Sequence, residues 1–137
     1  MSCVLRVAGE LLDLDKMLTA IQIRPYRVWR KGEPDRLGKR VHANSGACFT
    51  VSDAAIEDCL EKFREAYAFL EENLQDATKI GSFPGVDSAC LDFGVGLSPE
   101  QFSQSCTLTL DLLRLAVLAS LEIEFTQYAA SNPGAES

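Results

Sequence analysis

The sequence is poor in the residues from which common catalytic sites are built. Its 137 residues include one histidine, His42, and one tryptophan, Trp29. A Ser-His-Asp or Cys-His site needs an imidazole, and no serine lies in a G-x-S-x-G motif. The phosphate-binding patterns G-x-x-x-x-G-K-[ST] and G-x-G-x-x-G are also absent. We therefore predict a non-catalytic protein in preference to an enzyme.

Organised cysteine is lacking as well. No two of the five cysteines form a C-x-x-C pair. An odd number at irregular spacing, in a chain that starts without a recognisable export signal, indicates reduced thiols. Some of them lie in apolar patterns, where a free cysteine behaves as a small hydrophobic residue. We expect neither a metal site nor a cofactor. The cysteines are Cys3, Cys48, Cys59, Cys90 and Cys106.

A long apolar run is the third absence. The longest apolar window, LLRLAVLASL, is far shorter than the about 18 residues that a membrane-spanning helix needs. The first residues, MSCVLRVAGELLDLD, are too charged for a signal peptide. We expect a cytoplasmic protein with no membrane partner. The length fits a single domain over residues 1–130, followed by a flexible tail over residues 131–137.

What the sequence does have is an uneven distribution of charge. The net charge is −7, yet residues 24–42, RPYRVWRKGEPDRLGKRVH, hold seven of the thirteen Lys and Arg residues and only two acidic ones. The other residues hold six basic and eighteen acidic side chains. A basic segment on an acidic body mainly affects association and the steering of partners.

The hydrophobic pattern predicts strands that alternate with helices. The predicted order is β-α-β-β-α-β-α-β, in which the fourth element is either one interrupted strand or two separate ones. Such an order favours an α+β sandwich with a mostly antiparallel sheet and helices on one face, of ferredoxin-like kind. The predicted strands cover residues 3–8, 26–32, 39–51 (as one interrupted strand or two), 89–97 and 122–128, and the predicted helices cover residues 12–21, 53–74 and 98–121.

The two longer helices have the clearest signals. For residues 53–74 we predict Ser52 as the N-cap, with one apolar stripe directed to the core and the charged side chains in water. The second begins in a capping box, with Ser98 as the N-cap and Pro99 and Gln101 in its first turn. The predicted stripe is Ile56, Leu60, Phe63, Tyr67, Leu70 and Leu74, and the predicted solvent face is Glu57, Asp58, Glu61, Lys62 and Glu65.

Two stretches carry a family resemblance. The stretch GELLDLDKMLTAIQIRPYRVWRKGEP, followed later by GVGLSPEQF, resembles the small bacterial proteins grouped as domain of unknown function 4279. Gln22 stands where that family usually has glycine. The resemblance implies one α+β domain in the bacterial cytoplasm, and it implies no activity. The matching positions are Gly9, Leu12, Asp13, Ile23, Pro25, Trp29, Lys31, Gly32, Glu33, Leu97, Ser98, Pro99 and Glu100.

The basic segment is the first candidate site. A cluster of cations with Trp29 could grip a phosphate backbone, but the acidic body opposes nucleic acid at long range. We expect Trp29 to pack against the hairpin or the sheet rather than to bind a ligand. We favour a hairpin that binds a protein partner or a second copy, as a small immunity protein would bind a toxin. The predicted partner-binding residues are Arg27, Trp29, Arg30, Lys31, Arg36, Lys39 and Arg40.

The outer sheet face is the alternative site. The alternation in residues 89–97 places Asp92 away from the core, and Arg6 and Glu124 have the parity to share its face. Gly94 and Gly96 would leave the surface beside them bare. These charges could bind a small molecule or serve an unrecognised enzyme. They could equally form a salt-bridged surface or a dimer contact.

Overall fold

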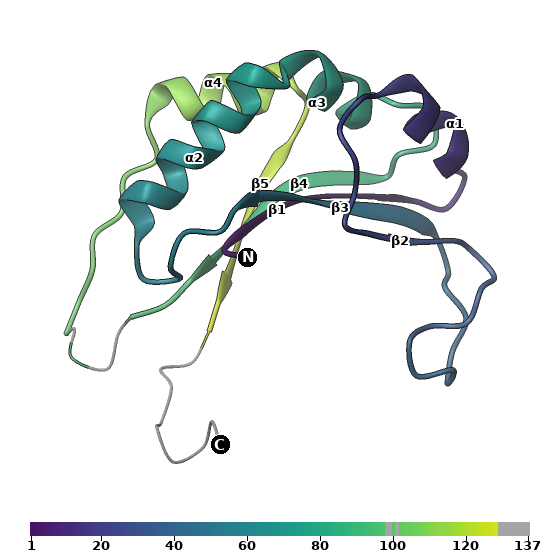
Figure 1. Cartoon of the computed structure of the whole chain (residues 1–137), viewed down its shortest axis with the longest axis horizontal. Helices are drawn as coiled ribbons and strands as arrows, with labels where there is room; N and C mark the ends of the chain where they lie inside the picture. The colour runs from purple at the N-terminus through teal and green to yellow at the C-terminus, as the bar shows by residue number, and fades with distance from the viewer. Residues whose placement is uncertain (98–99, 101, 129–137) are drawn as a thin grey trace.

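One five-stranded sheet carries all the helices on a single face (Figure 1). The computed structural model describes residues 1–97, 100 and 102–128, so the predicted tail at 131–137 lies outside the described residues. Within them the α+β class is confirmed. The strands are β1 (Cys3–Gly9), β2 (Arg27–Trp29), β3 (Ser45–Ser52), β4 (Ser88–Val95) and β5 (Glu122–Gln127), and the helices are α1 (Leu14–Ala20), α2 (Cys59–Glu72), α3 (Leu74–Gly81) and α4 (Leu110–Leu118).

The sheet is mixed rather than mostly antiparallel. Its strand order is β2-β3-β1-β4-β5, and β5 pairs in parallel with β4 while the other three pairings are antiparallel. The parallel pairing arises because α4 returns the chain across the helical face before β5 enters the sheet. A ferredoxin-like order for the whole chain is not confirmed.

Alternation along the strands separates the core from the outer face. In β1, Leu5 and Val7 are buried under the helices, whereas Arg6 between them points outward. In β4, Leu91 and Phe93 are likewise buried, and they lie in register with the buried Leu5 and Cys3 of β1. The prediction of an apolar inner face is confirmed for these strands.

Helix α2 starts later than predicted. Its N-cap is Asp58, whose side chain accepts a hydrogen bond from the backbone N–H of Glu61 at 3.1 Å. The predicted N-cap, Ser52, instead ends β3 and accepts from the N–H of Ala54 at 3.1 Å. Leu60, which was predicted to lie in the apolar stripe, is 71% exposed. The helix ends at Glu72, and the chain resumes as α3.

Lys62 is buried, although the sequence predicted that it would face water. Its side chain is 0% exposed, and its ammonium donates hydrogen bonds to the backbone oxygens of Ile56 and Gly94. Burial lowers the pKa of Lys62 because the apolar surroundings disfavour the charged form. Lys62 thus ties α2 to β4 and to the loop that precedes α2.

The predicted helix at residues 98–121 is shorter than expected. Its capping box at Ser98, Pro99 and Gln101 lies outside the described residues, and residues 102–109, which we name the strap, are not helical. Helix α4 begins only at Leu110, because the side chain of Thr109 caps it by accepting from the N–H of Leu112 at 3.2 Å. The strap therefore leads into α4 as chain without regular secondary structure.

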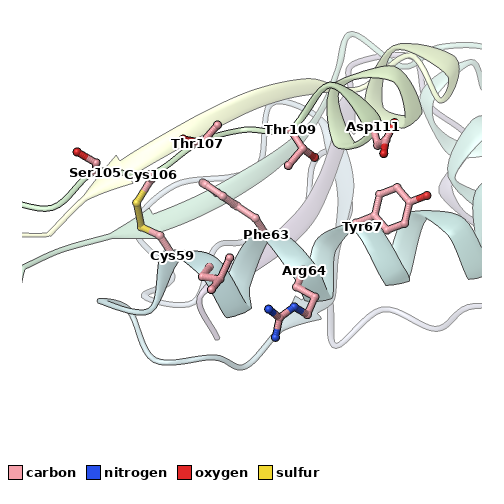
Figure 2. A pocket seen from close by; sticks show the side chains of 10 residues that line it. Cys59, Phe63, Arg64, Tyr67, Ser105, Cys106, Thr107, Thr109 and Asp111 are labelled. Carbon is pink, nitrogen blue, oxygen red and sulfur yellow. A yellow bond between two sulfur atoms is a disulfide. The ribbon is translucent and has the colours of Figure 1, made fainter.

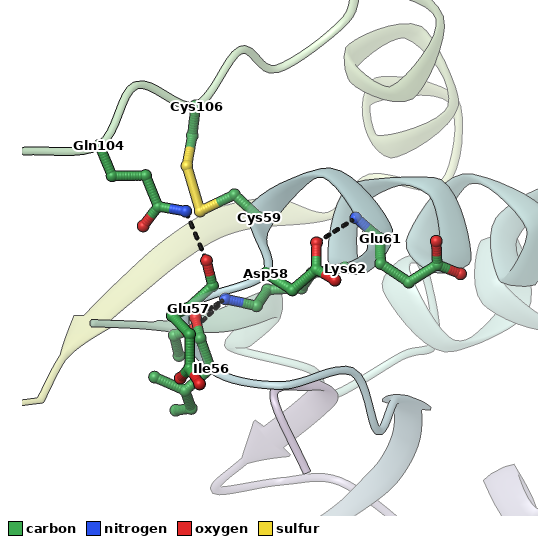
Figure 3. Close-up of a disulfide and its surroundings, with 9 residues drawn as sticks. Ile56, Glu57, Asp58, Cys59, Glu61, Lys62, Gln104 and Cys106 are labelled. Carbon is green, nitrogen blue, oxygen red and sulfur yellow. Dashed lines mark hydrogen bonds between the residues drawn. A yellow bond between two sulfur atoms is a disulfide. The ribbon is translucent and has the colours of Figure 1, made fainter. Parts of the chain in front are cut away.

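A disulfide joins the strap to α2, so the expectation that all thiols are reduced was wrong (Figure 3). It links Cys106 to Cys59, with a Cα–Cα distance of 5.9 Å. The side chain of Gln104 adds a hydrogen bond to the backbone oxygen of Glu57. Sequence spacing could not reveal this pair because the two cysteines lie 47 residues apart. Cys3, Cys48 and Cys90 are free.

The free thiols predict a loss of stability at alkaline pH. Burial raises the pKa of Cys3, Cys48 and Cys90. Unfolded thiols ionise at about pH 8.5, so above that pH the unfolded state binds fewer protons and the free energy of unfolding falls. Lys62, whose pKa is lowered, contributes a slope of opposite sign. Between about pH 7.5 and pH 10, we expect the free energy of unfolding, measured with urea, to fall less in Cys3→Ala than in the parent chain. Both chains retain Lys62, so its opposite contribution cancels in the comparison. An equal fall in both chains would contradict this.

Candidate interaction surfaces

The chain between β2 and β3, residues 30–44, forms an arm that leaves the sheet on the side away from the helices (Figure 1). Its two limbs pair through hydrogen bonds between Gly32, Glu33 and His42, each 2.9 Å long. At the tip, a side-chain oxygen of Asp35 accepts from the N–H groups of Leu37 and Lys39, each at 3.1 Å. These bonds give the arm a defined turn.

The base of the arm is held by ion pairs with the body. Arg30 lies 2.7 Å from Asp15, and Lys31 lies 3.2 Å from Glu10. Both pairs are exposed and add little to stability. They do, however, neutralise two of the predicted partner-binding residues within the chain, so the structure commits these cations to positioning the arm.

Arg27 and Trp29 lie on the outer sheet face rather than on the arm. The guanidinium of Arg27 stands 5.1 Å from the centre of the Trp29 ring system, a cation–π contact. Trp29 packs against Gly46, where an added Cβ would lie 2.3 Å from the ring, and its indole N–H donates to Asn44 at 2.9 Å. The structure places Trp29 against the sheet, as the sequence predicted.

The arm tip, residues 36–40 (RLGKR), holds the remaining predicted cations. Arg36, Lys39 and Arg40 are exposed, and within the part of the chain that the structure describes none of them forms an ion pair. Leu37 between them is 77% exposed, and Val41 beside them is 65% exposed. The tip thus presents three unpaired positive charges around an apolar side chain.

The alternative site on the outer face comes together as predicted. A guanidinium nitrogen of Arg6 lies 2.8 Å from a carboxylate oxygen of Asp92 and 2.7 Å from one of Glu124. Thr126 donates to the other oxygen of Asp92 at 2.7 Å, and the thiol of Cys90 lies 3.8 Å from Arg6. The sequence missed these last two residues, although both have the parity of the outer face.

This group is largely satisfied by its own contacts. Asp92 is only 14% exposed, and Arg6 bridges both carboxylates. The expectation of a bare surface at Gly94 and Gly96 was wrong, because an added Cβ at either glycine would lie within about 3 Å of Ile56. The chain itself covers this end of the face.

A cleft that the sequence did not indicate lies between α2, the strap and α4 (Figure 2). Its volume is about 600 Å³, with Leu60, Phe63 and Tyr67 of α2 along one wall and the disulfide at one end. At the other end stands Asp111 of α4. The pKa of Tyr67 is raised, first by a hydrogen bond to Glu71 and then by the charges of Glu71 and Asp111.

Comparison of the chain with family models, with curated proteins and with solved structures finds no match. In the described ranges, no helix is both long and apolar enough to cross a membrane. The same residues bring together no group of three His, Cys, Asp or Glu side chains that could hold a metal ion. The arm tip, the outer-face group and the cleft are therefore the sites from which a function can be argued.

Proposed function

We propose that this chain is a non-catalytic protein-interaction module that docks an acidic protein surface through its arm tip. One observation carries the proposal. Of the seven basic residues at 24–42, the four nearest the body are held by contacts within the chain, and only the three at the tip have no such partner among the described residues. Opposite charges across an interface speed encounter and fix register.

A protein partner fits these charges better than nucleic acid does. Binding to a nucleic acid relies on many phosphate contacts, because each neutralised phosphate releases counterions. The tip offers three free cations on a chain whose net charge is −7. The body would repel a polyanion that extends beyond the tip. An acidic patch on a folded protein is small enough to meet the tip alone.

The setting we propose is the bacterial cytoplasm, and the kind of module is that of a small immunity protein that neutralises a toxin. Two features support this. The chain is small and acidic, and its motifs at residues 9–34 and 94–102 resemble domain of unknown function 4279. The comparison with immunity proteins is one of size and charge, and it identifies no partner.

Charge reversal at the tip tests the proposal. We expect Arg36→Glu with Arg40→Glu to weaken partner binding by at least about tenfold, because attraction becomes repulsion at the contact. Tagged protein would capture partners from a nuclease-treated lysate of the source cells, and binding of the captured protein would then be measured by calorimetry. Lys16→Glu with Lys79→Glu makes the same change in net charge on α1 and α3 and serves as the control. Equal loss of binding in both variants would refute docking through the tip.

A second candidate is a small-molecule binder or enzyme on the outer face. It is favoured by the meeting of Arg6, Asp92 and Glu124, which come from three different strands. Asp92→Ala would release Arg6 and abolish any thermal shift produced by a charged small molecule, while reversal of the arm tip would leave that shift unchanged. The mutual pairing of these three residues makes this candidate the weaker of the two.

A further inference from the structure

The disulfide between Cys59 and Cys106 joins two parts of the chain that differ in their surroundings. Cys59 begins α2 and belongs to the core cluster, where it is 5% exposed. Cys106 is exposed and lies in the strap, which has no regular secondary structure. Exposed disulfides are in general reduced more readily than buried structural ones. The position of this bond is therefore typical of a labile disulfide.

The strap separates two cavities. Thr107 and Thr109 line the cleft of about 600 Å³ beside α2 (Figure 2). Gln104 and Leu108 line a second cavity, of about 670 Å³, whose other walls include residues of β4 and β5. Both halves of the disulfide and the side chain of Phe63 line both cavities. The strap and its disulfide thus form the partition between them.

An aromatic cluster lies against this partition. The ring centroid of Phe63 is 5.0 Å from that of Phe93 and 6.5 Å from that of Phe125. Phe63 and Phe93 are buried, whereas Phe125 is 48% exposed even with the strap in place. Removal of the strap would uncover Phe63 as well, because strap residues are among its neighbours in both cavities. The strap therefore covers apolar surface.

Few contacts other than the disulfide hold the first part of the strap. Within the ranges that the structure describes, the backbone of residues 102–107 forms no hydrogen bond with other backbone groups. The side chain of Gln104 donates to the backbone oxygen of Glu57 (Figure 3). The second part is anchored independently, since Leu108 packs against the core and Thr109 caps α4. Loss of the disulfide should thus free residues 102–107 and leave the rest of the fold in place.

We propose that the Cys59–Cys106 bond is a reversible redox switch that sets the position of the strap. In the oxidised chain the strap separates the two cavities. In the reduced chain residues 102–107 leave α2, and the cavities join into one apolar cleft along Phe63 and Phe125. The switch accounts for a disulfide in a chain that we assign to the bacterial cytoplasm, where the disulfides that do form are mostly transient or redox-sensing. It does not involve the arm tip, so it holds whether or not that tip docks a partner.

The electrons for opening come from a small-molecule thiol or a protein dithiol. Its thiolate attacks the exposed sulfur of Cys106, the S–S bond breaks, and Cys59 leaves as a thiolate that takes up a proton. A second thiolate of the reductant then displaces the first from Cys106. Cys106 is released as a thiol, and the reductant departs as its own disulfide. Oxidised glutathione reverses these steps and closes the strap.

NMR relaxation of the ¹⁵N-labelled chain tests the switch. Backbone order parameters are measured in the oxidised chain and again after reduction with dithiothreitol. We expect those of residues 103–107 to fall on reduction to below about 0.6, while those of α2 and α4 stay near about 0.85. Cys106→Ser should show the low strap values with and without reductant. Cys90→Ser, which keeps the disulfide, should respond to reductant as the parent chain does.

Reoxidation of the reduced chain with oxidised glutathione tests reversibility. Peptide mass spectrometry without reductant should recover Cys59–Cys106 as the main disulfide. Order parameters that do not change on reduction would overturn the proposal, because other contacts would then hold the strap. Loss of the dispersed amide spectrum throughout the reduced chain would overturn it too, since the bond would be required for the fold. So would reoxidation that pairs other cysteines or forms no disulfide.

Discussion

Replacement of Cys106 by serine is expected to lower the free energy of unfolding by about 4 kcal/mol under oxidising conditions. The disulfide to Cys59 joins residues that lie 47 positions apart, and closing a loop of that length restricts the unfolded chain strongly. The conformation of the folded state should change less, because Thr109 still caps α4 and the partly buried Leu108 still packs against the core. The effect should therefore appear mainly as lost stability rather than as a changed fold.

Urea unfolding with and without dithiothreitol measures this effect. The reductant should lower the stability of the parent chain to that of Cys106→Ser and leave the variant unchanged. Cys90→Ser serves as the control, because it removes a free thiol and leaves the disulfide intact. A parent chain whose stability is unaffected by reductant would show that the bond contributes nothing, and the strap would then be held by its other contacts alone.

Replacement of Lys62 by alanine is expected to lower the free energy of unfolding by about 3–5 kcal/mol. The change leaves a cavity where the buried stem packed, and it removes the donor for the backbone oxygens of Ile56 and Gly94. Lys62→Met keeps most of the volume and removes the buried charge, whose desolvation opposes folding. We expect it to lose about 2 kcal/mol less than Lys62→Ala, because relief of desolvation offsets part of the lost hydrogen bonding.

Thermal and urea unfolding of both variants would test these values. Lys16→Ala on α1 is the matched control, since that lysine is exposed and its loss should change stability by no more than about 0.5 kcal/mol. If Lys62→Ala behaved like Lys16→Ala, the side chain would be in water, as the sequence pattern alone indicated. If Lys62→Met were as harmful as alanine, the two carbonyl contacts would dominate over packing.

The strands and the outer-face group could be predicted because they depend on local parity. Alternation in β4 assigns Leu91 and Asp92 to opposite faces whatever the neighbouring strands are. The parity of Arg6 and Glu124 then places them on the face of Asp92, and the ion pairs confirm it. No long-range knowledge is needed for this step beyond the pairing of the strands.

Features that depend on contacts far apart in the sequence could not be predicted. The helical pattern assigned Lys62 to water because it could not show that the carbonyl of Gly94 would arrive at its ammonium. The disulfide could not be predicted for the same reason, since no local spacing relates Cys59 to Cys106. The cleft could not be predicted either, because it forms where the strap, held by that disulfide, passes α2.

The basic segment lies between these cases. Composition alone predicted a charged hairpin, and the structure has an arm at that place. Composition could not separate the cations of the base from those of the tip, because the carboxylates of Glu10 and Asp15 that bind Lys31 and Arg30 come from a different part of the chain. Only the folded arrangement identifies the tip as the part left for a partner.

The most direct measurement of docking through the arm tip is photo-crosslinking from Leu37. The change Leu37→p-benzoylphenylalanine places a reactive group at the end of the arm, and Ala68 on α2 offers a control position for the same group. Irradiation followed by peptide mass spectrometry should yield a crosslink from the arm tip to a second protein molecule. The central claim would be contradicted if crosslinks between molecules were no more frequent from Leu37 than from the control position.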